Sequence, residues 1–192
     1  ALENAEIVIS LQGVVPEERR ERVMGLLADV GLGVPDFQAG ERTFQLLYQV
    51  AGRSGRGAEA GRVIVQTYQP DNYAIKAAAA QDYRSFYSQE IDHRREHRNP
   101  PFSRLVRLSY SHVNGAKCER EAVRLCGLLS DEQTSWGLSD VEILGPTPAH
   151  PARVRGHYRW QLVLRGADPR VLLDKVTMPN GWDVDIDPMG LG

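Results

Sequence analysis

The stretch Asn99-Pro100-Pro101-Phe102-Ser103-Arg104-Leu105-Val106 divides the chain into two parts of different character. Before it, apolar side chains recur with helical spacing over residues 73–97, and the two prolines stop that helix. After it, residues 105–110 read Leu-Val-Arg-Leu-Ser-Tyr, a pattern typical of a strand. The sequence therefore predicts a domain boundary at residue 99.

The part after this boundary alternates between strand and helix signals. Helical spacing over 117–129 follows the first strand, and further strands are predicted at 141–144, 158–164 and 182–186. Asp168-Pro169-Arg170 predicts the start of a short helix, with Asp168 as its N-cap. The resulting order β-α-β-β-α-β is that of a split β-α-β sandwich, an α+β fold.

The part before the boundary predicts strand, loop, strand, helix and strand over the first 70 residues. This order indicates the end of an α/β unit with a parallel sheet. The strands fall at 7–11, 23–30 and 61–68, and the helix falls at 41–51. We therefore expect three segments: 1–70 for this unit, 71–99 for a connecting helical segment, and 100–192 for the C-terminal domain.

Composition limits the classes of function. The 192 residues are 42% hydrophobic with a formal net charge of −2, so the chain can bury a core but has no overall basic field. Cys118 and Cys126 do not have zinc-ligand spacing and are expected to be reduced apolar residues, as in the cytosol. No apolar run is long enough for a membrane span, and the start lacks a signal peptide and an initiator Met, which suggests a fragment.

One glycine-rich segment has the form of a phosphate sensor. It reads Gln49-Val50-Ala51-Gly52-Arg53-Ser54-Gly55-Arg56-Gly57. An arginine fork matches phosphate oxygens, and an arginine finger stabilises charge on a transferring γ-phosphoryl group. The segment therefore predicts a nucleic-acid-dependent ATPase element with Arg53 and Arg56 as its fingers. The alternative is a solvated Gly/Arg loop.

A basic stripe lies near the end of the chain, where no acidic residue occurs between positions 150 and 165. Such arginines give sequence-independent, salt-sensitive affinity for phosphates. Tyr158 and Trp160 alternate with them and either stack on unpaired bases or face the core. A second basic group surrounds the boundary and is partly explained as charge at a helix C-terminus. The stripe is Arg153, Arg155, His157, Arg159 and Arg165, and the second group is Arg94, Arg95, Arg98, Arg104 and Arg107.

Acidic residues alternate near the end of the chain, at Asp183, Asp185 and Asp187. They are expected to form a solvated face or to pair with arginines, and we predict no metal site.

These blocks together resemble the primosomal protein N′ (PriA) family of bacterial replication-restart helicases. The resemblance runs from residue 23 almost to the end of the chain. It rests on the helicase motif at 49–57, the Pro-Pro-Phe-Ser-Arg block at 100–104, Leu144-Gly145-Pro146, the block at 158–162 with Arg159-Trp160-Gln161, and the run at 184–188.

The resemblance implies an ATP-dependent 3′-5′ DNA helicase that binds stalled forks and D-loops and restarts replication by primosome assembly. It implies the α/β end of a RecA-like helicase lobe followed by a ribosomal-protein-like split β-α-β domain. Gln49, Arg53 and Arg56 would sense the nucleotide, while Arg104, Arg153, Arg155 and Arg159 would bind DNA. Arg170 would grip the C-terminal tail of single-stranded-DNA-binding protein.

The expected partners are branched and single-stranded DNA, that tail and other primosome proteins, with no membrane. The expected location is cytoplasmic and nucleoid-associated. ATP and magnesium belong to the intact protein and zinc to an upstream insert, so none is expected on this chain. The sequence contains no G-x-x-x-x-G-K-[ST] phosphate loop, so the chain alone is catalytically incomplete.

One departure leaves the activity open. Where the family carries a motif close to G-T-Q-M-x-x-K-G, this chain has Ser10-Leu11-Gln12-Gly13-Val14-Val15-Pro16, in which only Gln12 matches. The alternatives are therefore a helicase-defective, fork-binding scaffold of the same family and an RNA-binding domain.

Overall fold

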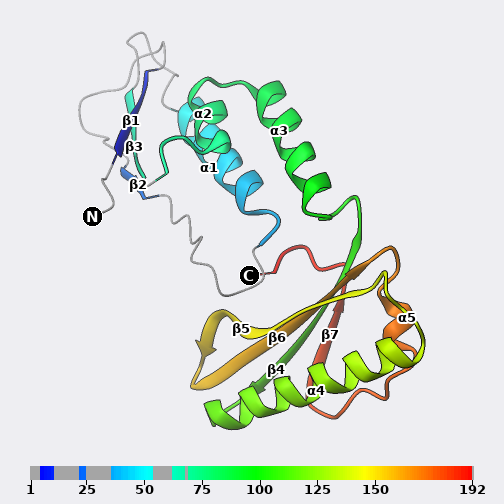
Figure 1. Cartoon of the computed structure of the whole chain (residues 1–192). Coiled ribbons are helices and arrows are strands. Elements are labelled where there is room, and N and C mark those ends of the chain that lie inside the picture. The colour runs from blue at the N-terminus through cyan, green and yellow to red at the C-terminus, as the bar shows by residue number, and fades with distance from the viewer. Residues whose placement is uncertain (1–4, 11–21, 25–35, 54–61, 68, 192) are drawn as a thin grey trace. The chain divides into compact units, whose positions relative to one another are not determined.

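The computed structural model describes residues 5–10, 22–24, 36–53, 62–67 and 69–191 (Figure 1). The chain forms two compact units, one of residues 1–28 and 38–93 and the other of residues 29–37 and 94–192. The helical residues up to 93 therefore group with the first unit. The predicted division into 1–70, 71–99 and 100–192 stays a prediction.

A small sheet with strand order β1-β3-β2 lies in the first unit. It is built from β1 (Ala5–Ser10), β2 (Arg22–Met24) and β3 (Arg62–Thr67). Strands β2 and β3 are parallel and are joined through α1 (Ala39–Arg53), as a β-α-β crossover requires. The expected parallel sheet is therefore found only in part, because β1 pairs with β3 in the antiparallel sense.

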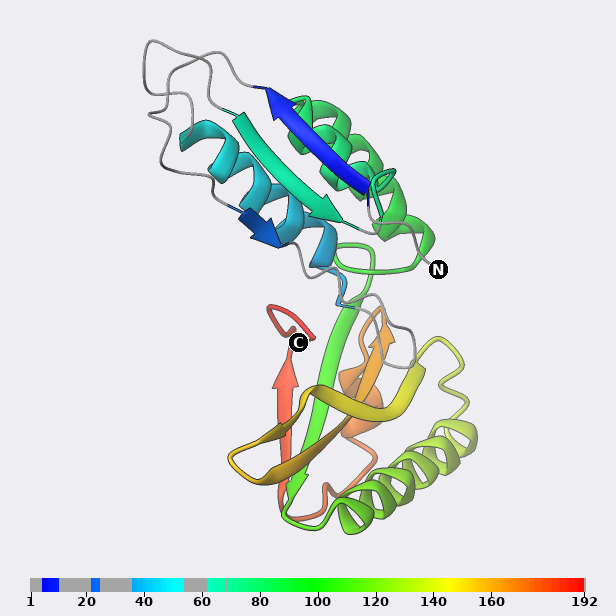
Figure 2. The same ribbon diagram turned by 90° about the vertical axis from the view of Figure 1, so that its left-hand side faces the viewer.

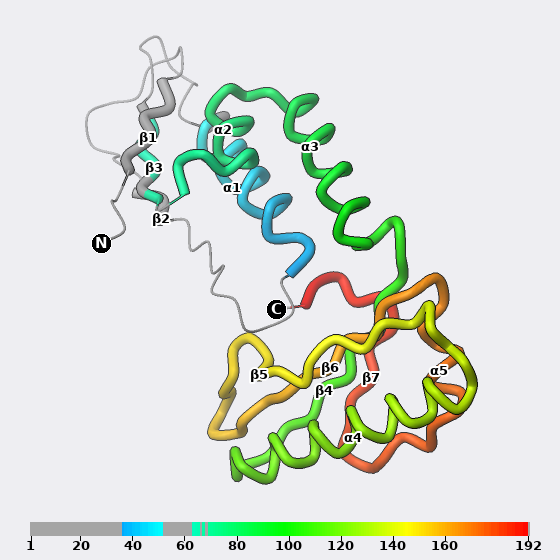
Figure 3. Tube along the Cα trace, viewed as in Figure 1, coloured from blue at the N-terminus to red at the C-terminus, as the bar shows by residue number. Residues whose placement is uncertain are grey.

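Two further helices pack with α1 in this unit, α2 (Tyr73–Ala79) and α3 (Tyr83–Glu96) (Figure 3). The single helix predicted over 73–97 is therefore wrong. Gln81 has a positive φ of 52°, which ends α2, and the Asp82 carboxylate accepts a hydrogen bond from the Ser85 amide at 3.0 Å to begin α3. The core gathers apolar side chains from α1, β3, α2 and α3, including Phe44, Leu47, Val63, Val65, Ile75 and Phe86.

The second unit follows the predicted order of strand, helix, strand, strand, helix and strand. The elements are β4 (Arg104–His112), α4 (Gly115–Ser135), β5 (Glu142–Val154), β6 (His157–Gly166), α5 (Arg170–Leu173) and β7 (Trp182–Ile186). The sheet order is β5-β6-β4-β7, and all three strand pairs are antiparallel. Its assignment to the split β-α-β class stays a prediction.

Helix α4 covers one face of this sheet because its apolar residues recur at helical spacing (Figure 1). Its buried residues are Cys118, Ala122, Leu125 and Leu129. The Asn114 side chain caps the helix by accepting from the Lys117 amide at 3.0 Å. Between helix and sheet lies a core that includes Val106, Leu108, Leu162, Leu164 and Leu172.

The opposite face of the sheet is covered in part by the end of the chain. Leu191 packs on Leu105 and Val163, with Phe37 beside them. Asp185 of β7 lies on this face and accepts a hydrogen bond from Arg107 at 2.7 Å, so this carboxylate pairs with an arginine. Within the described residues, no helix is both long enough and apolar enough to cross a membrane.

Candidate nucleic-acid interface

The outer ends of β5 and β6 form a hairpin that we call the arm, residues 148–160 (Figure 2). The sequence predicts a strand only at 141–144, but β5 runs to Val154. Its register with β6 shifts between Leu144 and Thr147 and again between Pro148 and Arg153. Residues 150–158 are all exposed, whereas Ala149 is buried and Arg159 and Trp160 are half-buried.

The arm ends in a two-residue turn, Arg155-Gly156, closed by the pairing of Val154 with His157. Both turn residues have positive φ, 48° for Arg155 and 86° for Gly156. This is the pattern of a type I′ hairpin turn, which favours Asn-Gly at these two positions. An arginine in the left-handed region costs about 1 kcal/mol relative to asparagine or glycine, so the backbone of the turn is strained. The Arg155 side chain at this turn is exposed.

Tyr158 holds the base of the arm against α4. A Cβ atom added to Gly115, the first residue of α4, would lie 3.3 Å from the Tyr158 ring, so the ring packs directly on that glycine. The guanidinium carbon of Arg153 lies 4.9 Å from the centre of the same ring, a cation–π contact worth about 0.5–1 kcal/mol. Of the two aromatic residues that were expected either to stack on bases or to face the core, Tyr158 is 37% exposed and Trp160 is half-buried, so neither side chain is fully buried.

Charge pairing separates the predicted arginines into two groups. Among the residues that the structure describes, no carboxylate lies within 4.0 Å of Arg153, Arg155 or Arg159. Arg165 is different: its guanidinium donates to Glu142 at 3.0 and 2.7 Å and to the His97 carbonyl at 2.7 Å. The unneutralised charge of the stripe is therefore confined to the arm.

The basic group around residue 99 is mostly engaged within the second unit. Arg94 donates to the Pro100 carbonyl at 3.3 Å, and the Arg95 guanidinium lies 4.8 Å from the centre of the Phe102 ring. Arg98 donates to a backbone carbonyl at 3.5 Å. These contacts favour a structural role for this group.

Arg104 and Arg170, predicted for DNA and for a partner protein, lie together in one ion network. Arg170 donates to both carboxylate oxygens of Asp168 at 2.7 Å. Arg104 donates to both oxygens of Asp187 and lies 4.0 Å from Asp168. Two cations and two carboxylates therefore alternate at this end of the sheet, beside α5.

The guanidinium of Arg170 lowers the pKa of the Asp168 carboxyl to about 2, and the Arg170 amide adds to the effect. That amide hydrogen bond is 3.2 Å long. The Asp168 carboxylate thus accepts a hydrogen bond from the first backbone amide of α5, that of Arg170. The N-cap residue of α5 is Pro169, one residue later than the predicted N-cap Asp168. Both carboxylates remain charged at neutral pH and compete with any acidic ligand for the two arginines.

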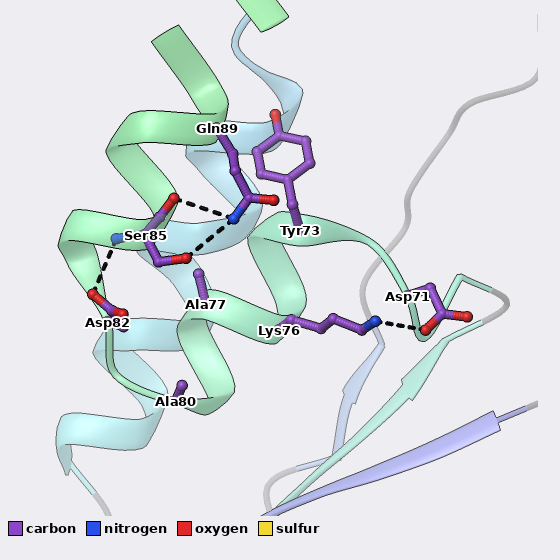
Figure 4. A pocket seen from close by; sticks show the side chains of 8 residues that line it. All are labelled: Asp71, Tyr73, Lys76, Ala77, Ala80, Asp82, Ser85 and Gln89. Atoms are coloured by element: carbon purple, nitrogen blue, oxygen red, sulfur yellow. Dashed lines mark hydrogen bonds and ion pairs between the residues drawn. The ribbon is translucent and has the colours of Figure 1, made fainter. Parts of the chain in front are cut away.

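A pocket of about 370 Å³ lies in the first unit between α2 and α3 (Figure 4). Its polar groups bond to one another: Lys76 pairs with Asp71 at 2.7 Å, and the Gln89 amide donates to the Ser85 hydroxyl at 3.1 Å. Because these polar groups already pair with one another, we assign the pocket no role.

The two cysteines follow the expected apolar behaviour in part. Cys118 is buried and donates to the carbonyls of Tyr110 and Tyr158, both at 3.4 Å, whereas Cys126 is only half-buried. Burial raises the pKa of both thiols. In the described part of the chain, no cluster of His, Cys, Asp and Glu could hold a metal ion.

Comparison with known proteins identifies the family. Residues 95–189 match the sequence family described as the primosomal protein N C-terminal domain. The chain is 41% identical over 140 residues to the replication restart protein PriA of Bacillus subtilis, and 37% identical over 180 residues to that of Treponema pallidum. The chain belongs to the PriA family. The matches cover 73% and 88% of this chain but only 17% and 27% of the two relatives.

A third PriA relative, from Chlamydia pneumoniae, is 34% identical over 173 residues, which is 85% of this chain and 23% of the relative. The resemblance read from the sequence is thereby confirmed. The segment that matches the family's C-terminal domain contains the whole arm and the ion network.

The PriA-type arginine–glycine motif lies on and after α1. Gln49 is exposed, and Arg53 is the last residue of the helix. Arg56 lies outside the described residues. The structure therefore places two of the three predicted nucleotide-sensing positions on one helix.

Sequence reasoning missed Gly115, and it named Asp168 only as an N-cap and Asp187 only as part of an acidic face that would be solvated or pair with arginines. Gly115 gives Tyr158 its seat, and no local pattern connects the two positions. Asp168 and Asp187 hold the arginines of the network. The pair of Asp168 and Arg170 has a local signal, since they flank Pro169, but Asp187 is far from Arg104 in sequence and only the fold brings them together.

Proposed function

We propose that this part of a PriA-family protein binds branched DNA through the arm, at stalled forks and D-loops. The observation that carries the proposal is a set of three arginines on one hairpin, Arg153, Arg155 and Arg159, which have no carboxylate partner among the residues that the structure describes. Arg153 and Arg155 are exposed, and Arg159 is half-buried. Arginines already paired with carboxylates must exchange a partner to meet a phosphate, whereas these three need only release water and salt ions. The arm therefore binds a polyanion at a lower cost than the paired arginines of the second unit would.

The parent protein on this proposal is an ATP-dependent 3′-5′ helicase that restarts replication by assembling the primosome at the nucleoid. The first unit would be the end of a RecA-like lobe, and the second a split β-α-β domain. Gln49, Arg53 and Arg56 would face the γ-phosphate of ATP and its magnesium, with the phosphate loop supplied from elsewhere in the protein. Zinc would bind in an upstream insert. Both cysteines of this chain lie in α4 and donate hydrogen bonds to backbone carbonyls.

A second surface on the same domain is proposed for protein partners. Arg170 and Arg104, with the exposed Val171 and Ile186 nearby in the fold, suit an acidic and apolar peptide such as the tail of single-stranded-DNA-binding protein. Other primosome proteins are further candidates for this surface.

The test of DNA binding measures the affinity for a fork-shaped DNA by fluorescence anisotropy at a series of salt concentrations. Changing Arg155 and Arg159 together to alanine should weaken binding and reduce the slope of log K against log salt by about 1.8, two phosphate contacts at about 0.9 each. Arg124→Ala is the matched control, because Arg124 is exposed but paired with Glu121 at 2.7 Å. An unchanged slope in the double variant would remove the arm from the interface.

Two further experiments test the alternatives, a helicase-defective scaffold and an RNA-binding domain. ATP hydrolysis by the full-length protein is measured with and without single-stranded DNA. Hydrolysis that DNA does not stimulate favours the scaffold over a motor. Competition between fork DNA and structured RNA across the salt series tests the RNA-binding alternative. RNA winning at every salt concentration would overturn the replication-restart proposal.

A further inference from the structure

Three exposed tyrosine side chains gather in the first unit, where α1 meets α3. Tyr48 of α1 is 41% exposed, and Tyr83 and Tyr87 of α3 are 58% and 54% exposed. The centres of the Tyr83 and Tyr87 rings lie 6.2 Å apart. We call these three rings the tyrosine patch. Single exposed apolar side chains are ordinary, whereas a group of neighbouring ones marks a contact surface.

A buried pair of rings holds the tyrosine patch in place. Phe44 of α1 stacks on Phe86 of α3 with the ring centres 4.1 Å apart, and each is only 4% exposed. The ring centre of Tyr48 lies 5.3 Å from that of Phe44, and the ring centre of Tyr83 lies 6.1 Å from it. The exposed rings therefore continue the core of the first unit out to its surface. Tyrosine loses little conformational entropy on binding, so such a surface is suited to a contact.

The charges of the two helices do not form a basic surface. Helix α3 carries three arginines and three carboxylates, and α1 carries Arg42 and Arg53 against Glu41. Surfaces on which unpaired bases stack lie along a positively charged groove that follows the phosphate backbone. The balanced charge therefore favours a polypeptide over a nucleic acid as the group that covers the patch. Tyrosine fits such a contact, because its ring buries apolar area while its hydroxyl finds a hydrogen-bond partner.

The PriA relatives are several times longer than the region that they share with this chain. The match covers 17% of the relative from Bacillus subtilis and 27% of that from Treponema pallidum. Another part of the same polypeptide meets the patch at a high effective concentration. A separate partner or a second copy would first have to offset the loss of its translational and rotational freedom.

We propose that the tyrosine patch docks on another part of the same PriA-family polypeptide, outside residues 1–192. The surface that it meets is apolar and carries polar groups that hydrogen-bond to the tyrosine hydroxyls. The inference is independent of the proposed DNA binding, because no residue of the arm takes part in it.

Hydroxyl-radical footprinting, read by mass spectrometry, compares the 192-residue chain with the full-length protein in the absence of DNA. Tyr83 and Tyr87 should be oxidised several-fold more slowly in the full-length protein, at every protein concentration. Tyr158, which is 37% exposed in the second unit, is the reference and should be oxidised at equal rates in the two. Equal rates at Tyr83 and Tyr87, or a slowing that Tyr158 shares, would overturn the proposal.

The same footprint separates the other occupants. Slowing that appears only at high protein concentration would show that a second copy covers the patch. Slowing that appears only after single-stranded DNA is added would show that bases stack on it. Either result would overturn docking within one polypeptide, and neither would bear on DNA binding by the arm.

A double variant, Tyr83→Ala with Tyr87→Ala, gives a second measurement. Both rings are more than half exposed in the 192-residue chain, so its melting temperature should change little. The melting temperature of the full-length protein should fall by several degrees, because the docked contact is lost. Val123→Ala is the matched control, since Val123 is 56% exposed on α4 and should alter neither protein. An equally small change in both proteins on removing the two tyrosines would contradict docking.

Discussion

Replacing Arg170 with alanine should raise the pKa of the neighbouring Asp168 carboxyl. The two side chains share two hydrogen bonds of 2.7 Å, and this pairing lowers the pKa of Asp168 to about 2 from the ordinary value of 3.8. Without the guanidinium, the closest cation is Arg104 at 4.0 Å, too far for a hydrogen bond. The pKa should therefore move most of the way back towards 3.8.

The difference is largest near pH 3. There a carboxyl with a pKa of 2 is about nine-tenths ionised, and one with a pKa of 3.8 is about one-seventh ionised. Carboxyl-carbon NMR of isotope-labelled chain, titrated from pH 6 downwards, measures this directly. Because the folded-state pKa is depressed, the pair stabilises the fold above the ordinary pKa, and that contribution is lost as pH falls towards 2. Arg124→Ala should leave Asp168 unchanged, and an Asp168 midpoint near pH 4 in the unchanged chain would refute the pairing.

Three other changes test the fold and the network. Leu108→Ala, at a fully buried position, should lower the free energy of unfolding in urea by about 2–5 kcal/mol, and a loss under about 1 would contradict its place in the core. Gly166→Ala should cost about 1–3 kcal/mol, because its Cβ would lie 2.9 Å from a backbone oxygen, whereas the open site Gly127 in α4 should gain about 0.5–1 kcal/mol from alanine. Asp168→Asn should free Arg170 and strengthen binding of an acidic peptide several-fold by calorimetry, and weaker binding would show that Asp168 helps the peptide instead of competing with it.

Elements with local patterns could be predicted from the sequence. The strand 182–186 agrees with β7, and the helix 117–129 lies inside α4, because apolar side chains recur at the period of each structure. The alternation of acidic residues also led to the expectation that these carboxylates pair with arginines, and Asp185 accepts a hydrogen bond from Arg107. The family was found in the same way, from short blocks in a fixed order.

Features that depend on distant pairing could not be predicted. The arm was missed because Gly145, Pro146 and Pro151 argue against a strand, and β5 accommodates them only at its two shifts in register. The break in the helix at Gln81 depends on a single backbone angle. The separation of free from paired arginines follows from long-range contacts such as Arg165 with Glu142, which no local pattern encodes.

The central claim is that the arm is the surface that meets DNA. Chemical-shift mapping by NMR, with the isotope-labelled 192-residue chain and an unlabelled fork, tests it residue by residue. The account predicts that the largest perturbations on adding DNA fall at residues 150–159, with Arg155 and Gly156 among them. Perturbations confined to β7 and α5, with the arm unchanged at saturating DNA, would contradict it.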